Sequence, residues 1–206
     1  MHIDDIPLAS QGTRISLTAV HGDGLLPYLD DLAALRIAVF REWPYLYEGN
    51  LGYEANYLGR YAACSDSLTL LCHHGPKLIG ASTALPMVNA EEDMQAPLLR
   101  AAIPLDRVLY YGESLILPSY RGFGLGRQFF QYREQHAQQL AVDIACFCAV
   151  ERPDAHPGRP PHYRGNDAFW LRQGYLPTSM ICQFDWPDIG ENATSTKPLR
   201  FWIKPL

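Results

Sequence analysis

The sequence lacks the long apolar run of a membrane-spanning helix, and it lacks an excess of positive charge. No stretch approaches the roughly 20 consecutive apolar residues that such a helix needs. Lysine and arginine together number 17, against 22 aspartates and glutamates, which gives a formal net charge of −5. An acidic protein has no general attraction for phosphate backbones or anionic lipid surfaces. These shortages argue against a nucleic-acid partner and against a membrane partner.

Cysteine is also scarce, and its spacing does not indicate a disulfide framework. The five cysteines are an odd number, and three of them lie in apolar, strand-like runs, as expected of buried reduced thiols. Cys146 and Cys148 are the one close pair, and no second pair completes a zinc site. The segment 1–11 is acidic where a secretory signal would be basic and then apolar. We therefore expect a cytoplasmic protein without a metal site.

What the sequence does contain is enough apolar residues for one sizeable core. They make up 48% of the 206 residues, whereas glycine and proline, at 16 each, are too few to indicate disorder or a fibrous repeat. The chain shows no internal repeat and no low-complexity segment. We expect a single domain over residues 1–206.

The periodicity of apolar residues predicts an α/β chain with the order β-α-α-β-β-β-α-β-α-β-β. Strands are expected at 13–20, 68–73, 77–88, 107–117, 143–150, 176–186 and 198–204. Helices are expected at 27–42, 53–64, within 121–140 and at 167–173, with a further short helix near 95–102. The second and third strands form a hairpin, and the strand–helix–strand unit over 107–150 implies parallel neighbours.

The most informative segment is a glycine-rich turn that leads from a strand into a helix. It consists of Arg121, Gly122, Phe123, Gly124, Leu125, Gly126 and Arg127. Glycines let a ligand approach the backbone and let successive N–H groups point toward it, and the positive end of the helix also favours an anion. Neither common nucleotide fingerprint is present, because no Lys-Ser/Thr follows and the third glycine comes one residue early. The turn predicts an anion-binding cradle.

This segment resembles motif A of the GNAT superfamily of acyl-CoA-dependent N-acetyltransferases. Arg121, Gly124 and Gly126 meet the pattern R/Q-x-x-G-x-G/A, and the preceding strand, the Tyr-Arg-Gly sequence and the element order agree with the family. A second signature, A-x-x-F-Y-x-x-x-G-F, is matched in part by residues 168–175. Trp170 stands there in place of the usual tyrosine, and we expect it to border the cofactor. The resemblance implies a mixed, mainly antiparallel sheet flanked by helices.

The resemblance covers most of residues 13–187 and implies acetyl-CoA as the acyl donor. The strand backbone at Leu115, Ile116 and Leu117 would pair with the pantetheine arm, and the glycine turn would hold the pyrophosphate. A strand N–H near Ile116 or Leu117 would polarise the thioester carbonyl and stabilise the oxyanion. An amine would then attack directly, without a protein nucleophile or a metal.

The attacking amine must first lose a proton, because an alkylammonium group of pKa about 10 has no lone pair. Glu113 is the preferred base, since a carboxylate in an otherwise apolar strand has a raised pKa. A salt-bridged or solvated residue at the sheet edge is the alternative interpretation. Glu151 is the alternative base, because it follows the parallel strand at 143–150. An indole cannot supply a proton near neutral pH, so Tyr163 replaces Trp170 as the candidate acid, unless Tyr163 is only a packed loop residue.

The aromatic segment 40–48 lies between the first two helices, on the side that borders the acceptor in this family. Glu42 and Glu48 would meet a cationic amine, which favours a small amine or an amino-acid-like acceptor. Core packing explains Trp43 and Tyr45 about as well. Two alternatives stay open: a non-catalytic acyl-CoA sensor or interaction module, and a nucleotide-binding protein that uses the same turn. A homodimer formed through the last strands is also compatible with the sequence.

Overall fold

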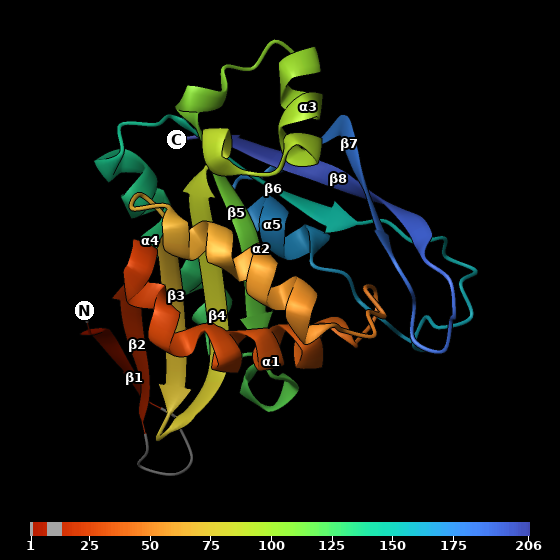
Figure 1. Ribbon diagram of the computed structural model, residues 1–206, viewed down its shortest axis with the longest axis horizontal. Helices are drawn as coiled ribbons and strands as arrows, with labels where there is room; N and C mark the ends of the chain where they lie inside the picture. The colour runs from red at the N-terminus through yellow and green to blue at the C-terminus, as the bar shows by residue number, and fades with distance from the viewer. Residues whose placement is uncertain (1, 8–13) are drawn as a thin grey trace.

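Within residues 2–7 and 14–206, which the structure describes, a sheet of eight strands has helices on both faces (Figure 1). The structure is a computed structural model. The strands are β1 (His2–Pro7), β2 (Arg14–Val20), β3 (Leu68–His74), β4 (Lys77–Pro86), β5 (Val108–Ile116), β6 (Ile144–Val150), β7 (Leu176–Trp186) and β8 (Ser195–Pro205). The helices are α1 (Leu29–Phe40), α2 (Leu51–Ala63), α3 (Glu92–Arg100), α4 (Leu125–Gln139) and α5 (Asp167–Arg172). Short 3₁₀ helices connect them: η1 (Gly22–Tyr28), η2 (Met87–Asn89), η3 (Leu105–Arg107) and η4 (Pro118–Tyr120).

The strand order in the sheet is β1-β2-β3-β4-β5-β6-β8-β7, so β8 lies between β6 and β7. Neighbouring strands are antiparallel except for β5 and β6, which are parallel and joined through α4. The predicted mixed, mainly antiparallel sheet with its β3–β4 hairpin is therefore confirmed. β1 was not predicted, and Thr13, where the first strand was expected to begin, lies outside the described residues. The first long helix begins at Leu29, because η1 occupies the residues before it.

Alternate side chains of the central strands enter two different cores. Leu71 of β3 and Leu115 of β5 pack with buried residues of α1 and α2. Leu70 of β3 and Leu109 of β5 pack with Phe129 and other buried residues of α4 on the opposite face. Figure 1 shows α1 and α2 crossing in front of the sheet, with α4 on the far side. A strand buried on both faces reads as a continuous apolar run, which explains the runs seen in the sequence.

β5 and β6 pair only at their amino ends and then separate. The paired residues are Val108 with Ile144, Leu109 with Ala145 and Tyr110 with Cys146. β5 continues to Ile116 and β6 to Val150, and beyond these three pairs β6 bonds only to β8 on its other edge. In Figure 1, β6 turns away from β5. The edge of β5 that faces β6 is therefore left without a partner strand after Tyr110.

A bulge in β5 lies just past this point. The flanking pairs are Ser82 with Ser114 and Ala84 with Tyr111. Gly112 and Glu113 thus face the single residue Thr83 of β4. One extra residue reverses the alternation of a strand, so Glu113 shares a face with Tyr110 and Leu115, toward α1 and α2.

Gly112 is required at the bulge because other side chains fill the space beside it. A Cβ at this position would overlap the hydroxyl of Tyr61 and lie 2.7 Å from Oγ1 of Thr83. The interruption that glycine predicts in this strand is confirmed, both as a bulge and as a close approach.

The cysteines and the helices bear on two further expectations. All five cysteines are buried and none forms a disulfide, which agrees with the expected buried thiols. In the described part of the chain, no helix combines the length and the apolar character needed to cross a membrane.

Candidate active site

The glycine turn is open and its N–H groups are free. Gly122 and Gly124 have φ angles of +86° and +85°, which L-residues rarely adopt, and a Cβ on either would meet nothing within 4 Å. No described residue accepts a hydrogen bond from the five N–H groups of residues 122–126. The N–H groups of Arg127 and Gln128 bond back to the Gly124 carbonyl at 3.1 and 3.3 Å, which starts α4. Free amides at a helix N-terminus are the arrangement expected of an anion-binding cradle.

Arg121 is held across the end of β5. Its Nε donates to the Ile116 carbonyl oxygen at 3.1 Å, and its Nη1 lies 2.8 Å from Oε2 of Glu42. Glu42 was expected to meet the amine; the structure pairs it with Arg121 and does not place it on the wall of the cavity described below. The ion pair joins the glycine turn to the segment after α1.

Main-chain groups along β5 alternate between its two neighbours. The N–H of Leu117 donates to the Ile79 carbonyl oxygen at 3.0 Å, so it points toward β4. Leu115 lies two residues earlier and points the same way, whereas Ile116 faces the side on which β6 has separated. The expectation that all three residues pair with a ligand is therefore wrong for Leu115 and Leu117. The main-chain groups of Ile116 have the orientation needed to bond to a ligand in the gap between β5 and β6.

A cavity of about 420 Å³ lies between the α1–α2 connection, the β5 bulge and the ends of β6 and β7. Its aromatic lining residues are Phe40, Tyr45, Tyr47, Tyr53, Tyr57, Tyr110, Phe184 and Trp186. Tyr110, Gly112 and Cys148 also line it, and these residues lie where β5 and β6 part. The cavity therefore reaches the gap between the two strands.

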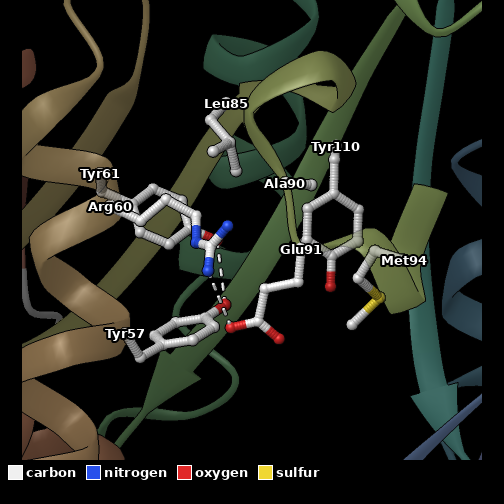
Figure 2. A pocket seen from close by; sticks show the side chains of 8 residues that line it. All are labelled: Tyr57, Arg60, Tyr61, Leu85, Ala90, Glu91, Met94 and Tyr110. Atoms are coloured by element: carbon white, nitrogen blue, oxygen red, sulfur yellow. Dashed lines mark hydrogen bonds and ion pairs between the residues drawn. The ribbon is translucent and has the colours of Figure 1, made fainter.

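A much smaller hollow adjoins this cavity and shares Tyr57, Met94 and Tyr110 with it. Figure 2 shows Tyr57 and Tyr110 pointing into the hollow from α2 and β5. The ion pair of Arg60 and Glu91, at 3.3 Å, lies beside it. This side of the cavity is thus bordered by aromatic rings and by a neutralised pair of charges.

Glu113 takes part in a buried network of charges. Nη1 of Arg36 contacts one oxygen of its carboxylate, and the Thr83 hydroxyl donates to the other. Nε of Arg36 contacts Glu54, and the exposed fractions of the three charged side chains are 7% or less. The expectation of apolar surroundings for Glu113 is wrong: the carboxylate is salt-bridged, as in the alternative interpretation, but it is buried and not solvated.

Arg36 stays protonated in this network. Desolvation lowers its pKa, but the neighbouring Tyr57 and Glu54 outweigh this effect and hold the pKa above its ordinary value. Its guanidinium group also lies 4.1 Å from the centroid of the Tyr57 ring. The sequence analysis missed Arg36 and Glu54. A signal for Arg36 was present, since it lies three and four residues after the buried Ala33 and Leu32, on the inner face of α1.

With this geometry in view, comparisons with known proteins show a shared architecture. No protein-family model and no curated protein matches the sequence. Among solved structures, a ribosomal-protein-alanine N-acetyltransferase from Brucella melitensis is similar, with a TM-score of 0.57, 14% identity and coverage of 92% of this chain and 99% of that one. An acetyltransferase of the GNAT family from Streptococcus pneumoniae has a TM-score of 0.56 and 14% identity, and the match covers 92% of this chain and 99% of that one. The structure of the protein yncA from Salmonella typhimurium includes its cofactor acetyl-CoA. Its TM-score is 0.51 at 11% identity, and the match covers 92% of this chain and 94% of that one.

The chain has the GNAT fold. The resemblance inferred from the glycine turn and the element order is confirmed at the level of architecture. At sequence identities of 11–14%, these similarities establish the fold and do not identify the acceptor.

Of the three predicted catalytic residues, only Glu113 lines the cavity of this GNAT fold. Glu151 pairs with Arg200 of β8, and its side chain is 42% exposed. The Tyr163 ring forms a T-shaped pair with the Trp43 ring, with the ring centroids 6.1 Å apart. Burial and Asp167 raise the pKa of Tyr163, while Arg159 and Arg121 act in the opposite direction.

Trp170 lies on the other face of the GNAT sheet. Its ring packs at 5.1 Å from the Phe147 ring and 5.0 Å from the Trp202 ring, on the side covered by α4 and α5. Gly126 lies nearby, and a Cβ there would lie 3.4 Å from the ring of Phe169. This is an ordinary van der Waals distance, so the packing of α5 on the turn does not by itself require a glycine at position 126.

Proposed function

We propose that the protein transfers an acetyl group from acetyl-CoA to a primary amine by direct attack. One observation carries the proposal: the gap between β5 and β6 has free amides of the glycine turn at its open end and the aromatic cavity at its closed end. A donor held at the turn and an acceptor held in the cavity would meet where the strands part. Holding two reactants in this way is a large part of catalysis for a reaction that needs no covalent intermediate.

The donor is assigned to the α4 side of the gap. The amides of residues 122–126 would hold its pyrophosphate, and Ile116 would bond to its pantetheine amides on the edge that β6 leaves open. Trp170 would border the same arm. The presence of acetyl-CoA in yncA, which has the same fold, supports this assignment.

Glu113 is proposed as the base, because its carboxylate lines the cavity and is fixed by Arg36 and Thr83. The ammonium group gives one proton to Glu113 or to a water bound to it, which passes it on to solvent, and the amine nitrogen attacks the carbonyl carbon. The nitrogen then loses its second proton to the same base as the carbon–sulfur bond breaks and the amide forms. A thiol of pKa about 8.5 departs readily as the thiolate, so the reaction depends less on a proton donor than on a base. Tyr163 is the proposed donor.

An acyl-CoA sensor is the second candidate. Two observations favour it: Trp170 replaces the usual tyrosine, and both carboxylate oxygens of Glu113 already accept hydrogen bonds. Such a protein would keep the cradle and have no transfer activity.

Calorimetry with CoA, ATP and NAD, followed by thiol release from acetyl-CoA over a panel of amines, separates the candidates. We expect binding of CoA but not of ATP or NAD, and thiol release with at least one amine. CoA binding without release on any amine would favour the sensor. Absence of CoA binding would contradict both the acetyltransferase and the sensor.

A further inference from the structure

We infer that the acceptor is a cationic amine with an aromatic body and without a carboxylate, that is, a decarboxylated aromatic amino acid rather than an amino acid. This inference rests on the proposed function and names the substrate class of the same site. Three properties of the cavity carry it: rigid aromatic walls, an excess of carboxylates, and a lining cation that is already shared. The volume of about 420 Å³ is in the range of small-molecule sites, roughly 300–1,000 Å³.

The aromatic walls account for eight of the nineteen lining residues. Tyr45 and Trp186 are stacked with ring centroids 6.0 Å apart, and the Trp186 indole N–H donates to the Tyr45 carbonyl oxygen at 3.0 Å. Arg152 donates to the same carbonyl at 2.8 Å and binds Asp188 through two contacts of 2.7 Å. These bonds hold the rings in place before any ligand arrives. Fixed aromatic faces stack on a flat ring and attract a cation.

The charges on the wall are mainly negative. Three carboxylates line the cavity, those of Glu48, Glu113 and Asp185, against the single cation of Arg36. Glu48 is paired with Arg41 at 3.0 Å, and Arg36 is shared by Glu113 and the buried Glu54. One carboxylate oxygen of Glu54, Oε1, is buried without a hydrogen-bond partner. Arg36 is therefore held by two carboxylates and is not free to pair with a ligand.

The tyrosine hydroxyls do not change this balance near neutral pH. Burial raises the pKa of Tyr45, Tyr47, Tyr53 and Tyr57, so these side chains stay uncharged. The nearby cations Arg152 and Lys197 contact Asp188 and lie outside the lining. An ammonium group is attracted by this wall, whereas the carboxylate of an amino acid would face other carboxylates and meet no cation that is not already shared.

Matched pairs of compounds test the inference on the intact protein. Tyramine with tyrosine and tryptamine with tryptophan differ only by the carboxylate. We expect kcat/KM for acetyl transfer to be higher for each amine than for its amino acid by about a hundredfold or more, as a few unfavourable charge contacts require. Equal values, or a preference for the amino acids, would overturn the inference and leave the proposed function standing.

Binding without acetyl-CoA separates failure of the inference from failure of the function. If CoA binds and no amine reacts, calorimetry of the same four compounds still decides: tyramine and tryptamine must bind more tightly than tyrosine and tryptophan. If none of the four binds, the cavity is not a site for this class and the inference is wrong.

A rim carboxylate provides a variant that keeps the fold. Asp185 is exposed and lines the cavity, so Asp185→Asn should reduce the preference for tyramine over tyrosine by about tenfold. Asp106→Asn is the matched control, because Asp106 is an exposed aspartate outside the lining, and it should leave the preference unchanged. An unchanged preference in Asp185→Asn would contradict the role given to charge.

Discussion

Arg36 and Glu113 form an ion pair inside the protein although 77 residues separate them in the sequence. The pair joins α1 to the bulge in β5, and Glu54 of α2 completes it from a third element. The carboxylate proposed as the base is therefore positioned by the helical layer as well as by its own strand. Such a network is strongly stabilising only while all its members are present.

Removal of the shared cation should destabilise the fold. Arg36→Met leaves two buried carboxylates without their shared cation, and we expect the free energy of unfolding to fall by about 3–5 kcal/mol. Arg60→Met is the matched control, because its ion pair with Glu91 is partly exposed, and it should change stability by less than about 1 kcal/mol. Urea denaturation measures both. An equal loss of unfolding free energy in the two variants would show that the buried ion pair stabilises the fold no more than the exposed one.

The two candidate bases give different expectations. Glu113→Gln should lower kcat by about 10²–10⁴-fold near neutral pH, and the loss should shrink as the pH approaches the amine pKa of about 10, where the neutral amine needs no base. Glu151→Gln should keep the rate of the original protein, because Glu151 pairs with Arg200 outside the cavity. Rates of thiol release from pH 6.5 to 10 test both variants. A Glu113→Gln protein with full activity at every pH would exclude this residue as the base.

The glycine turn can be tested against a glycine elsewhere. Gly124→Ala should weaken CoA binding by about tenfold or more, because a Cβ would stand where the diphosphate approaches. Gly190→Ala has similar backbone strain, with φ of +83° and open space around it, and should not affect CoA binding. Each variant should lose about 1–2 kcal/mol of stability. If calorimetry finds the same CoA affinity in both, the diphosphate does not lie on this turn.

Stability should fall as the pH rises above about 10. Burial raises the pKa of several tyrosines, so the folded state keeps protons that the unfolded state releases from about pH 10. These residues are Tyr45, Tyr57, Tyr110, Tyr111 and Tyr175. Arg133 acts the other way, because burial lowers its pKa to about 10 and its unfolded form binds the proton more strongly, but it is a single group.

Each such tyrosine contributes a loss of up to about 1.4 kcal/mol per pH unit. Denaturation midpoints from pH 8 to 11, recorded with phenolate absorbance, measure the effect. We expect phenolate to appear together with unfolding. Titration of these tyrosines near pH 10 in a protein that stays folded would contradict their burial.

The parts of the site that depend on neighbouring residues could be predicted from the sequence. The turn from Arg121 to Gly126 is contiguous, and its need for positive φ is a local property that glycine reveals. Gly112 likewise marked the bulge. The order of strands and helices followed from periodicity, because each element shows its own pattern of burial.

The parts that depend on distant residues could not be predicted. The other members of the Glu113 network come from α1, α2 and β4, and one sequence does not show which charges meet across such separations. Propensity also misled at β1, whose residues His2–Pro7 include two aspartates and a proline; an edge strand needs only one neighbour and tolerates them. The orientation of Leu117 needed the register between β4 and β5, which composition does not contain.

The position of β8 between β6 and β7 determines how one wall of the cavity is held. β7 and β8 are consecutive antiparallel strands, and β7 is joined to the rest of the sheet through β8. Phe184 and Trp186 of β7 form part of that wall. A small shift of the β7–β8 hairpin relative to β6 would therefore change the width of the cavity without disturbing the glycine turn.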